Sequence, residues 1–271
     1  MYLTRHRTDG GPRWAVDGRF LPPLFNLGEL LEREAQAIDE WLRRIVIEEP
    51  ASAPMLAPLE SMHEVWASGV TYERSREARR AESDMGDVYD RVYVAERPEL
   101  FFKAIGWRVV GPGAPIRIRA DSRWNVPEPE LVLVLNSRRA VVGFCAGNDV
   151  SSRSIEGENP LYLPQAKIYA GACALGPGIQ LGDADALRDM PIQIEIERQG
   201  QAVFHGETRT SRMNRRFEDL VGYLGRELDF AQGVFLMTGT GIVPPDDFSL
   251  GIGDRVTITL GSMTLENEVG A

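Results

Sequence analysis

Three carboxylates near the middle of the chain are the residues best suited to chemistry. Glu128 and Glu130 stand two residues apart at the start of an apolar run, and Asp149 follows nineteen residues after Glu130. With no ligating His or Cys pair nearby, they would form an all-oxygen site, which suits Mg²⁺ first and then Mn²⁺ or Ca²⁺. On a strand both glutamates would share one face, where their charges repel unless a cation lies between them. The alternative is a solvated strand face, and the spacing alone does not decide between the two.

The spacing of the flanking strands does not by itself bring the three carboxylates together. A tight hairpin that turns at residues 136–137 would pair Glu130 with Gly143. Asp149 would then lie about 13 Å too far along its strand. Clustering therefore requires a bend near Gly147 or a different strand pairing.

Lys167 is a candidate for proton transfer because the chain uses lysine so rarely. Lys103 and Lys167 are its only two lysines, against 28 arginines. A compact ammonium group can lose its proton when it is desolvated, which a guanidinium group cannot do at working pH. The alternative is a solvated lysine without a chemical role.

Composition and charge exclude several classes of function. The 271 residues carry a formal charge of −10 with a pI near 5.0, which argues against nucleic-acid and anionic-membrane partners. No apolar run approaches the roughly 18 residues of a membrane span, and the arginine-rich start lacks the apolar core of a signal peptide. Cys145 and Cys173 have apolar neighbours and suit a reducing compartment, with a disulfide as the alternative. We therefore expect a soluble, cytoplasmic protein.

Patterns along the chain predict a domain boundary near residue 60. Residues 1–25 are typical of short strands and turns, and Asn26 is placed to cap a helix over about residues 28–46. The Pro- and Ala-rich stretch 50–58 is typical of a linker. Residues 1–60 would thus form a small N-terminal domain, and residues 61–271 the catalytic domain.

β-Structure dominates the remainder, with one further amphipathic helix at about residues 215–229. The hairpin turns are expected at residues 199–200 and 261–262. The predicted strands are 115–119, 130–135, 140–146, 191–197, 201–207, 255–260 and 263–268. The expected fold class is therefore α+β and rich in β-structure.

Six short motifs occur in a fixed order, at residues 98–103, 127–131, 147–153, 166–167, 175–177 and 238–241. Together they resemble the fumarylacetoacetate hydrolase superfamily over about residues 61–271. The resemblance implies a mixed β-sandwich roll with a small N-terminal α/β arm. It also implies that Glu128, Glu130 and Asp149 bind a divalent metal. Because both lysines fall on motif positions, Lys167 would act on the substrate and Lys103 would support the charge balance of the pocket.

One motif of that superfamily is altered in this chain. Many of its hydrolases carry N-Y-x-x-H-x-x-E, whose His/Glu dyad activates water, whereas Ser75 and Ala78 stand at those two positions here. The three histidines, His6, His63 and His205, are expected to be surface or structural residues. The departure argues against hydrolysis of a carbon–carbon bond.

Three longer segments, residues 65–76, 106–113 and 151–165, are similar to a narrower group, the sugar-acid dehydratases of the superfamily. This resemblance implies Mg²⁺-dependent loss of water from a 2-oxo-3-deoxy sugar acid in pentose catabolism. The expected reaction converts 2-dehydro-3-deoxy-D-arabinonate to 2,5-dioxopentanoate, and it needs no external water. Many family members have an Asp three residues after the active-site Lys, where this chain has Ala170.

Within that interpretation each polar residue of the motifs receives an expected role. Lys167 would move the C3 proton, and Glu156 and Glu158 would serve as acid and base at the leaving hydroxyl. Thr240 lies in a glycine-rich turn that lacks the spacing of a nucleotide-binding loop. Arg74, like Arg76, could instead be a surface charge. The residues expected to hold the substrate are Ser151, Arg153, Tyr162, Thr240 and Arg74.

Other interpretations stay open at this point. The same metal-stabilised enolate chemistry would serve an acylpyruvate or β-diketone hydrolase, an oxaloacetate decarboxylase or an enol–keto isomerase. The fold could also carry a binding protein without enzymatic activity. The resemblance implies a homodimer or homotetramer, for which the apolar strands near residues 255–268 could supply an interface.

Overall fold

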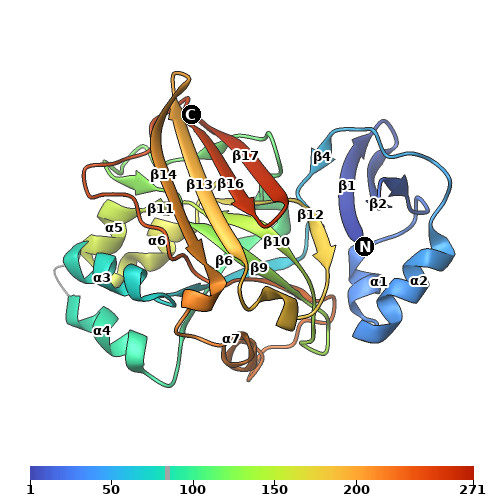
Figure 1. Cartoon of the computed structure of the whole chain (residues 1–271), viewed down its shortest axis with the longest axis horizontal. Coiled ribbons are helices and arrows are strands. Elements are labelled where there is room, and N and C mark those ends of the chain that lie inside the picture. The colour runs from blue at the N-terminus through green and yellow to red at the C-terminus, as the bar shows by residue number, and fades with distance from the viewer. Residues whose placement is uncertain (83–85) are drawn as a thin grey trace.

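Two packed β-sheets organise the fold, as Figure 1 shows. The computed structural model describes residues 1–82 and 86–271 of the chain. Among them, the larger sheet runs in the order β3-β2-β1-β12-β10-β9-β15-β5-β6, with β4 paired to β1. Its strands are β1 (Tyr2–Thr8), β2 (Gly11–Val16), β3 (Arg19–Phe20), β4 (Met55–Leu56), β5 (Glu64–Gly69), β6 (Glu99–Ile105), β9 (Pro129–Leu135), β10 (Val141–Asp149), β12 (Cys173–Leu181) and β15 (Val234–Met237).

The smaller sheet runs in the order β14-β13-β16-β17-β7, and β8 pairs with β11. These strands are β7 (Ile116–Arg117), β8 (Asn125–Val126), β11 (Ser151–Ser152), β13 (Pro191–Arg198), β14 (Gln201–Arg209), β16 (Arg255–Leu260) and β17 (Met263–Gly270). The helices are α1 (Leu27–Leu31), α2 (Ile38–Ile45), α3 (Glu73–Glu82), α4 (Gly86–Val94), α5 (Arg153–Glu158), α6 (Leu163–Lys167) and α7 (Phe217–Leu224). Short 3₁₀ turns are η1 (Ala35–Ala37), η2 (Gly106–Arg108), η3 (Pro160–Tyr162), η4 (Asp185–Leu187) and η5 (Thr210–Arg212). The expected β-rich α+β class is confirmed.

The central strand β9 is buried on both faces, and its side chains alternate between two cores. Leu131, Leu133 and Leu135 pack with apolar residues of the smaller sheet. Val132 and Val134 point the other way, into a core shared with α1 and α2. Because side chains alternate along a strand, Glu130 shares the face of the two valines. The carboxylates therefore belong to the face of the large sheet that turns away from the smaller one.

The register between β9 and β10 differs from the tight hairpin that the sequence suggested. Leu135 pairs with Val141, and a bulge follows, so that Glu130 lies opposite Gly147. The Asn136 side chain closes the wider turn, because its Oδ1 accepts from Ala140 N–H at 2.9 Å. The wider turn accounts for three of the four residues of the shift, and the bulge for the fourth. Of the two routes to a carboxylate cluster, the different strand pairing is the one that the chain uses.

The predicted helices form in part. The side chain of Asn26 caps α1 by accepting from Glu29 N–H at 2.8 Å, as expected. The expected single helix over residues 28–46 is wrong, because Glu34 has extended backbone and separates α1 from η1 and α2. Helix α7 is confirmed but ends at Leu224, before Gly225, so that Leu228 stays 41 % exposed.

The N-terminal segment joins the large sheet directly. Strand β1 pairs with β12, and β4, within the stretch expected to be a linker, pairs with β1. Leu3, Leu21 and Leu31 share one core with Val65 and Phe235 of the later part. The apolar core therefore runs across residue 60. The domain boundary near that residue stays a prediction.

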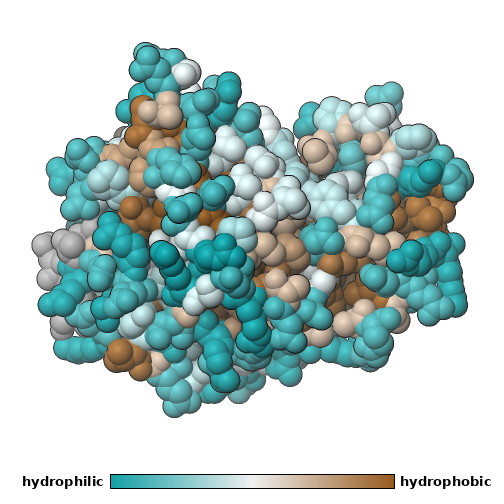
Figure 2. Space-filling model, viewed as in Figure 1, coloured by the Kyte–Doolittle hydropathy of each residue, from teal (hydrophilic) through white to brown (hydrophobic). Residues whose placement is uncertain are grey.

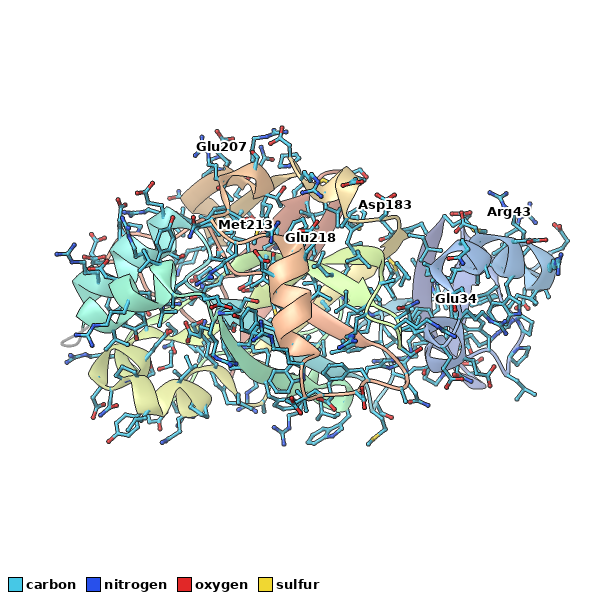
Figure 3. All side chains as sticks on the ribbon, turned by 90° about the horizontal axis from the view of Figure 1, so that it is seen from below. Glu34, Arg43, Asp183, Glu207, Met213 and Glu218 are labelled. Atoms are coloured by element: carbon cyan, nitrogen blue, oxygen red, sulfur yellow. The ribbon has the colours of Figure 1, made fainter. Side chains whose placement is uncertain are left out.

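The two hairpins of the smaller sheet are confirmed. Gln199 and Gly200 both have positive φ, 54° and 78°, which is typical of the two-residue turns that match strand twist. Gly261 turns the β16–β17 hairpin with φ 58°. The apolar side chains of β16 and β17 face the core, so they do not supply the exposed interface that the sequence suggested. Figure 3 shows α7 in front of the sheets, with Glu218 at its start, where it pairs with Arg188 at 3.0 Å.

The outer surface matches the acidic, polar composition. Figure 2 shows a mostly hydrophilic face on which apolar residues form only small groups. Cys145 and Cys173 are buried free thiols, so the disulfide alternative is not realised. Among the described residues, no helix is both long and apolar enough to cross a membrane.

Candidate metal centre and active site

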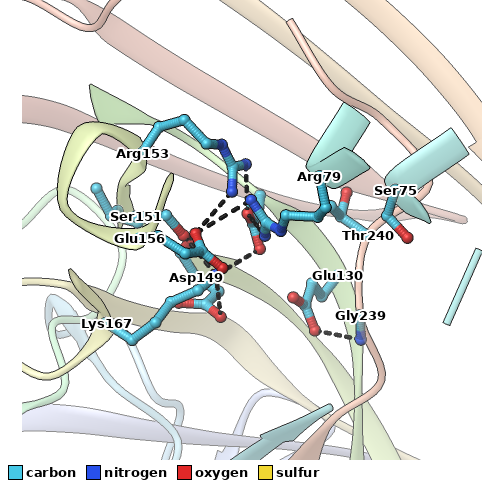
Figure 4. A network of polar contacts seen from close by, with 12 residues as sticks. Ser75, Arg79, Glu130, Asp149, Ser151, Arg153, Glu156, Lys167, Gly239 and Thr240 are labelled. Carbon is cyan, nitrogen blue, oxygen red and sulfur yellow. Dashed lines mark hydrogen bonds and ion pairs between the residues drawn. The ribbon is translucent and has the colours of Figure 1, made fainter. Parts of the chain in front are cut away.

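Glu128, Glu130 and Asp149 come together in a buried cluster where β9 begins and β10 ends, and Figure 4 shows Glu130 and Asp149 within it. One oxygen of each carboxylate lies within 4.8 Å of the other two. All three residues are buried. The backbone N–H of Asp149 donates to the carbonyl of Glu128 at 3.0 Å, so strand pairing itself places these two side by side. The strand register described above therefore produces the cluster.

Glu130 is the carboxylate of this cluster that most needs a cation. Within the described residues it accepts one hydrogen bond, from Gly239 N–H at 2.6 Å, and forms no ion pair. Burial, together with the charges of Asp149 and Glu128, raises the pKa of Glu130 well above its usual value. A cation that prefers oxygen ligands would relieve this repulsion, and three carboxylates are a donor set that fits Mg²⁺.

Gly239 can reach Glu130 only because it lacks a side chain. Its φ is 90°, in the region that favours glycine. A Cβ at this position would lie 2.1 Å from Thr71 Oγ1. The glycine-rich turn thus brings a backbone donor to the cluster, as the sequence suggested.

Lysines hold the Asp149 carboxylate from both sides. Lys167 Nζ lies 3.1 Å from Asp149 Oδ2 and also donates to Glu128 Oε2 at 2.8 Å and Ser151 Oγ at 2.6 Å. Lys103 forms an ion pair with the other oxygen, Asp149 Oδ1. Both ammonium groups are buried. Lys167 and Ser151, two of the residues expected in the site, therefore lie against the carboxylates.

The charge state of Lys167 differs from the one that burial alone would favour. Burial lowers the pKa of this ammonium group, but the carboxylates of Asp149, Glu128 and Glu156 outweigh it and raise the pKa above its ordinary value. Without a metal ion, Lys167 is therefore protonated at neutral pH. Desolvation by itself does not turn it into a base.

Two arginines and two glutamates form a closed ring of ion pairs. Arg79 contacts Glu128 Oε1 at 2.7 Å and Glu156 Oε2 at 3.1 Å. Arg153 contacts the same two oxygens at 2.8 and 2.7 Å. All four side chains are buried. Since Arg79 comes from α3 and Arg153 from α5, the ring joins these two helices to Glu128, and Figure 4 shows Arg79, Arg153 and Glu156 facing one another.

Glu99 is a further acidic group beside the ring. It begins β6 opposite Gly69, where a Cβ would lie only 2.0 Å from Glu99 Oε2. It also lines a cavity with Tyr89 of α4 and Leu163 of α6. Burial and the charge of Glu156 raise the pKa of Glu99 to about 7. Such a carboxyl group exchanges a proton near neutral pH.

Several expected site residues lie elsewhere. Thr240 is buried next to Gly239, and its Oγ1 accepts from Ile242 N–H at 3.2 Å. Glu158 is exposed at the end of α5, and Tyr162 is 38 % exposed on η3. Arg74 is exposed and lines a separate groove with His205 and Glu207. The structure does not bring Glu158, Tyr162 or Arg74 to the carboxylates.

The two positions of the missing dyad have structural roles. Ser75 Oγ donates to the Tyr72 carbonyl at 2.8 Å and accepts from Tyr72 N–H at 3.2 Å, which closes the first turn of α3. Ala78 is buried on the same helix. Neither side chain can take a proton from water.

The histidines take structural positions. His6 contacts the Ala53 carbonyl at 2.6 Å, and His63 contacts the Gln232 carbonyl at 3.1 Å. Burial lowers the pKa of His63, so it is neutral at physiological pH. His205 is exposed on β14. Each position agrees with the structural role that the sequence suggested.

Sequence reasoning missed two residues of the site, Arg79 and Glu99. A signal for each was present. Arg79 follows Ser75 by four residues, which puts both on one face of a helix. Glu99 precedes Lys103 by four residues, which puts both on one face of a strand. Either spacing would have pointed to the pocket once α3 and β6 were assigned.

Comparison with known proteins places the chain in a family. Residues 64–270 match the family model described as fumarylacetoacetate (FAA) hydrolase C-terminal. The chain therefore belongs to the fumarylacetoacetate hydrolase family.

Two relatives and a solved structure to which the chain is similar are named as dehydratases. The chain is 44% identical over 241 residues to a probable 2-keto-3-deoxyxylonate dehydratase of Haloferax volcanii, covering 88% of this chain and 80% of that protein. It is 44% identical over 206 residues to the 2-dehydro-3-deoxy-D-arabinonate dehydratase of Saccharolobus solfataricus, covering 74% and 69%. It superimposes with a TM-score of 0.85 and 33% identity on a 2-keto-3-deoxy-D-arabinonate dehydratase complexed with magnesium and 2,5-dioxopentanoate, covering 100% and 99% of the two chains.

Replacing Glu130 should separate metal binding from stability. Because no described cation pairs with Glu130, Glu130→Gln should leave the metal-free protein at least as stable as the wild type at pH 7.5. Glu128→Gln should instead destabilise it by about 3 kcal/mol or more, because Arg79, Arg153 and Lys167 lose a buried partner. Both variants should lose the increase in stability that Mg²⁺ gives the wild type.

Urea unfolding with EDTA and with Mg²⁺ measures these effects. Glu195→Gln is the control, since Glu195 is exposed on β13. If Mg²⁺ stabilises Glu130→Gln as it does the wild type, the carboxylate cluster is not the metal site.

Glu99 should make stability depend on pH. Its folded-state pKa is raised from 4.5 to about 7, so the folded chain keeps this proton to higher pH than the unfolded chain does. Its contribution is therefore lost as the pH rises through that window. Glu99→Gln should match the wild type near pH 4, below both pKa values, and exceed its stability at pH 8.5, by up to about 3 kcal/mol. Urea unfolding of metal-free protein at both pH values tests this, and an equal difference at both would contradict the assignment.

Proposed function

We propose that this protein removes water from a 2-oxo-3-deoxypentonate and forms 2,5-dioxopentanoate, with Mg²⁺ as its cofactor. The observation that carries the proposal is the buried cluster of Glu128, Glu130 and Asp149 against Lys167, in a chain without a water-activating dyad on α3. Two dehydratase relatives and a dehydratase structure with magnesium and 2,5-dioxopentanoate support 2-dehydro-3-deoxy-D-arabinonate as the substrate.

Charge in the site suits an anionic substrate on a divalent cation. The four buried carboxylates of the cluster and the ring are balanced by four cations, Arg79, Lys103, Arg153 and Lys167. With Mg²⁺ held by Glu128, Glu130 and Asp149, the site would carry an excess of positive charge. Bound there, Mg²⁺ would polarise the C2 ketone and stabilise the negative charge that develops on its oxygen when a C3 proton leaves.

Lys167 is the group that we propose for the C3 proton. Its ammonium group is held by three oxygens, so its position is fixed before substrate binds. Glu128 and Asp149 are the charges that keep it protonated in the metal-free protein. A cation held by Glu128 and Asp149 would leave less negative charge to raise the pKa of Lys167. The neutral amine of Lys167 would then be available as the base.

Glu99 is the group that we propose for protonation of the C4 hydroxyl, which then leaves as water. The sequence suggested Glu156 or Glu158 for this role. Glu156 is held by two guanidinium groups, and Glu158 is exposed. A pKa of about 7 gives Glu99 a useful fraction of both protonation states at neutral pH. The product of the elimination is an enone with a C5 hydroxymethyl group, which tautomerises to the aldehyde.

Arginines of the ring are the proposed contacts for the substrate oxygens. Arg153 and Arg79 present rigid donors beside Glu128, and guanidinium groups match carboxylate geometry. Ser151 accepts a hydrogen bond from Lys167, and Thr240 is buried next to Gly239, so both remain proposed contacts. Tyr162 and Arg74 receive no support from the described geometry.

Assembly and location stay predictions from the sequence. We propose a homodimer or homotetramer in the cytoplasm. Met62 and Trp107 are 70 % and 65 % exposed, and a hydrogen bond of 3.1 Å from Trp107 N–H to the Ser61 carbonyl joins their segments. Two exposed apolar side chains in one place are a reasonable contact for a second copy.

Dehydration can be tested by its product. Purified protein with Mg²⁺ and 2-dehydro-3-deoxy-D-arabinonate should form an aldehyde that a coupled NAD(P)-dependent semialdehyde dehydrogenase detects. In D₂O, deuterium should appear at C3 or C4 of the product, because both carbons pass through enol forms. Acylpyruvates should be cleaved slowly or not at all, since Ser75 and Ala78 cannot activate water. Efficient acylpyruvate cleavage without dehydration would overturn the proposal in favour of a hydrolase.

A further inference from the structure

The two lysines of the chain share one kind of environment. Every other basic residue besides the histidines is an arginine, 28 in all. Lys103 and Lys167 are both buried, and each ammonium group faces three oxygens. An ammonium group has three donors on a compact end, whereas a guanidinium group is planar and larger. Lysine therefore occurs in this chain where a buried cation contacts three oxygens.

The ammonium group of Lys103 contacts three oxygens of the protein. Its Nζ donates to the carbonyl of Lys167 at 2.6 Å and the carbonyl of Val150 at 3.2 Å, and it pairs with Asp149 Oδ1. Its side chain has no exposed surface. Because the side chain is fully buried and two of its donors are taken by carbonyls, Lys103 is not placed to contact a substrate.

These three contacts fix both ends of the Lys167 interaction. The bond to the Lys167 carbonyl holds the last residue of the short helix α6, from which the catalytic side chain starts. The ion pair at Oδ1 turns Asp149 so that Oδ2 meets Lys167 Nζ. The bond to Val150 holds the backbone just after Asp149. Lys103 thus sets the origin of one side chain and the orientation of its partner.

We propose that Lys103 is a positioning residue, which aligns Lys167 with Asp149 and with the metal-ligand oxygens. The catalytic part of this inference rests on the proposed dehydration. The alignment itself does not, because it concerns the metal-free protein. A displacement on the order of 1 Å at a reacting group can cost about a hundredfold in rate, so the proposal predicts a large effect from a residue that touches no substrate.

Nitrogen-15 labelling of lysine tests the alignment without any assay of activity. Protein labelled with ¹⁵N-lysine should give only two side-chain Nζ resonances, and Lys167→Met identifies which belongs to Lys103. In Lys103→Met, the remaining resonance should move and exchange its protons with water faster than in the wild type. Cys145→Ala is the control, because it removes another buried side chain from the same face of the sheet. An unchanged Lys167 resonance in folded Lys103→Met would overturn the proposal.

Kinetics and metal binding complete the test. In Lys103→Met, kcat should fall about a hundredfold while KM changes less than about threefold, since substrate contacts remain. Mn²⁺ should bind at least as tightly as in the wild type, because a positive charge beside Asp149 is removed. Loss of Mn²⁺ binding, or a wild-type kcat, would contradict a positioning role.

A second variant covers the case in which Lys103→Met does not fold. Lys103→Gln keeps amide donors for the Val150 and Lys167 carbonyls but removes the charge next to Asp149. Lys103→Gln should show smaller changes of the Lys167 resonance and of kcat than Lys103→Met. Failure of both variants to fold would show a purely structural role. If the wild type does not dehydrate the sugar acid, the proposed function fails while the lysine spectra still decide the alignment.

Discussion

Buried charge is the constraint on which the rest of this structure depends. Four carboxylates and four cations lie in one buried region, and the Asp149 carboxylate is shared between two lysines. Ions removed from water need oppositely charged partners in fixed geometry, and α3, α5, α6 and β6 each supply one cation. Among the described residues, Glu130 is the carboxylate that has no cation partner. A divalent metal would supply the missing positive charge.

Features far from the site decide whether the cluster forms. The turn closed by Asn136 and the bulge after Val141 set the register that places Gly147 opposite Glu130. Alternation along β9 sends its leucines into one core and its valines into the other, which anchors the strand on both faces. A central strand held in this way cannot slip, because a shift by one residue would exchange the two faces and bury the wrong side chains.

Much of this organisation could be predicted from the sequence, and the failures have physical causes. Apolar periodicity predicts β16, β13 and α7, because those patterns report which face is buried. Register is different, since it depends on a side-chain bond from Asn136 that propensity does not encode. Motif resemblance suggested a role in the site for Glu158. It did not predict that this side chain, at the end of α5, is exposed to solvent. Arg79 was not predicted, because it pairs with Glu156 of another helix and lies in an arginine-rich segment typical of a surface.

Diffraction at the manganese absorption edge tests the central claim most directly. Crystals of the wild type with Mn²⁺ and 2,5-dioxopentanoate should show one strong anomalous peak bound by Glu128, Glu130 and Asp149, with the 2-oxo acid end of the ligand on the metal. Lys167 should lie within reach of C3. A metal bound elsewhere, or a ligand that binds away from these carboxylates, would contradict the account.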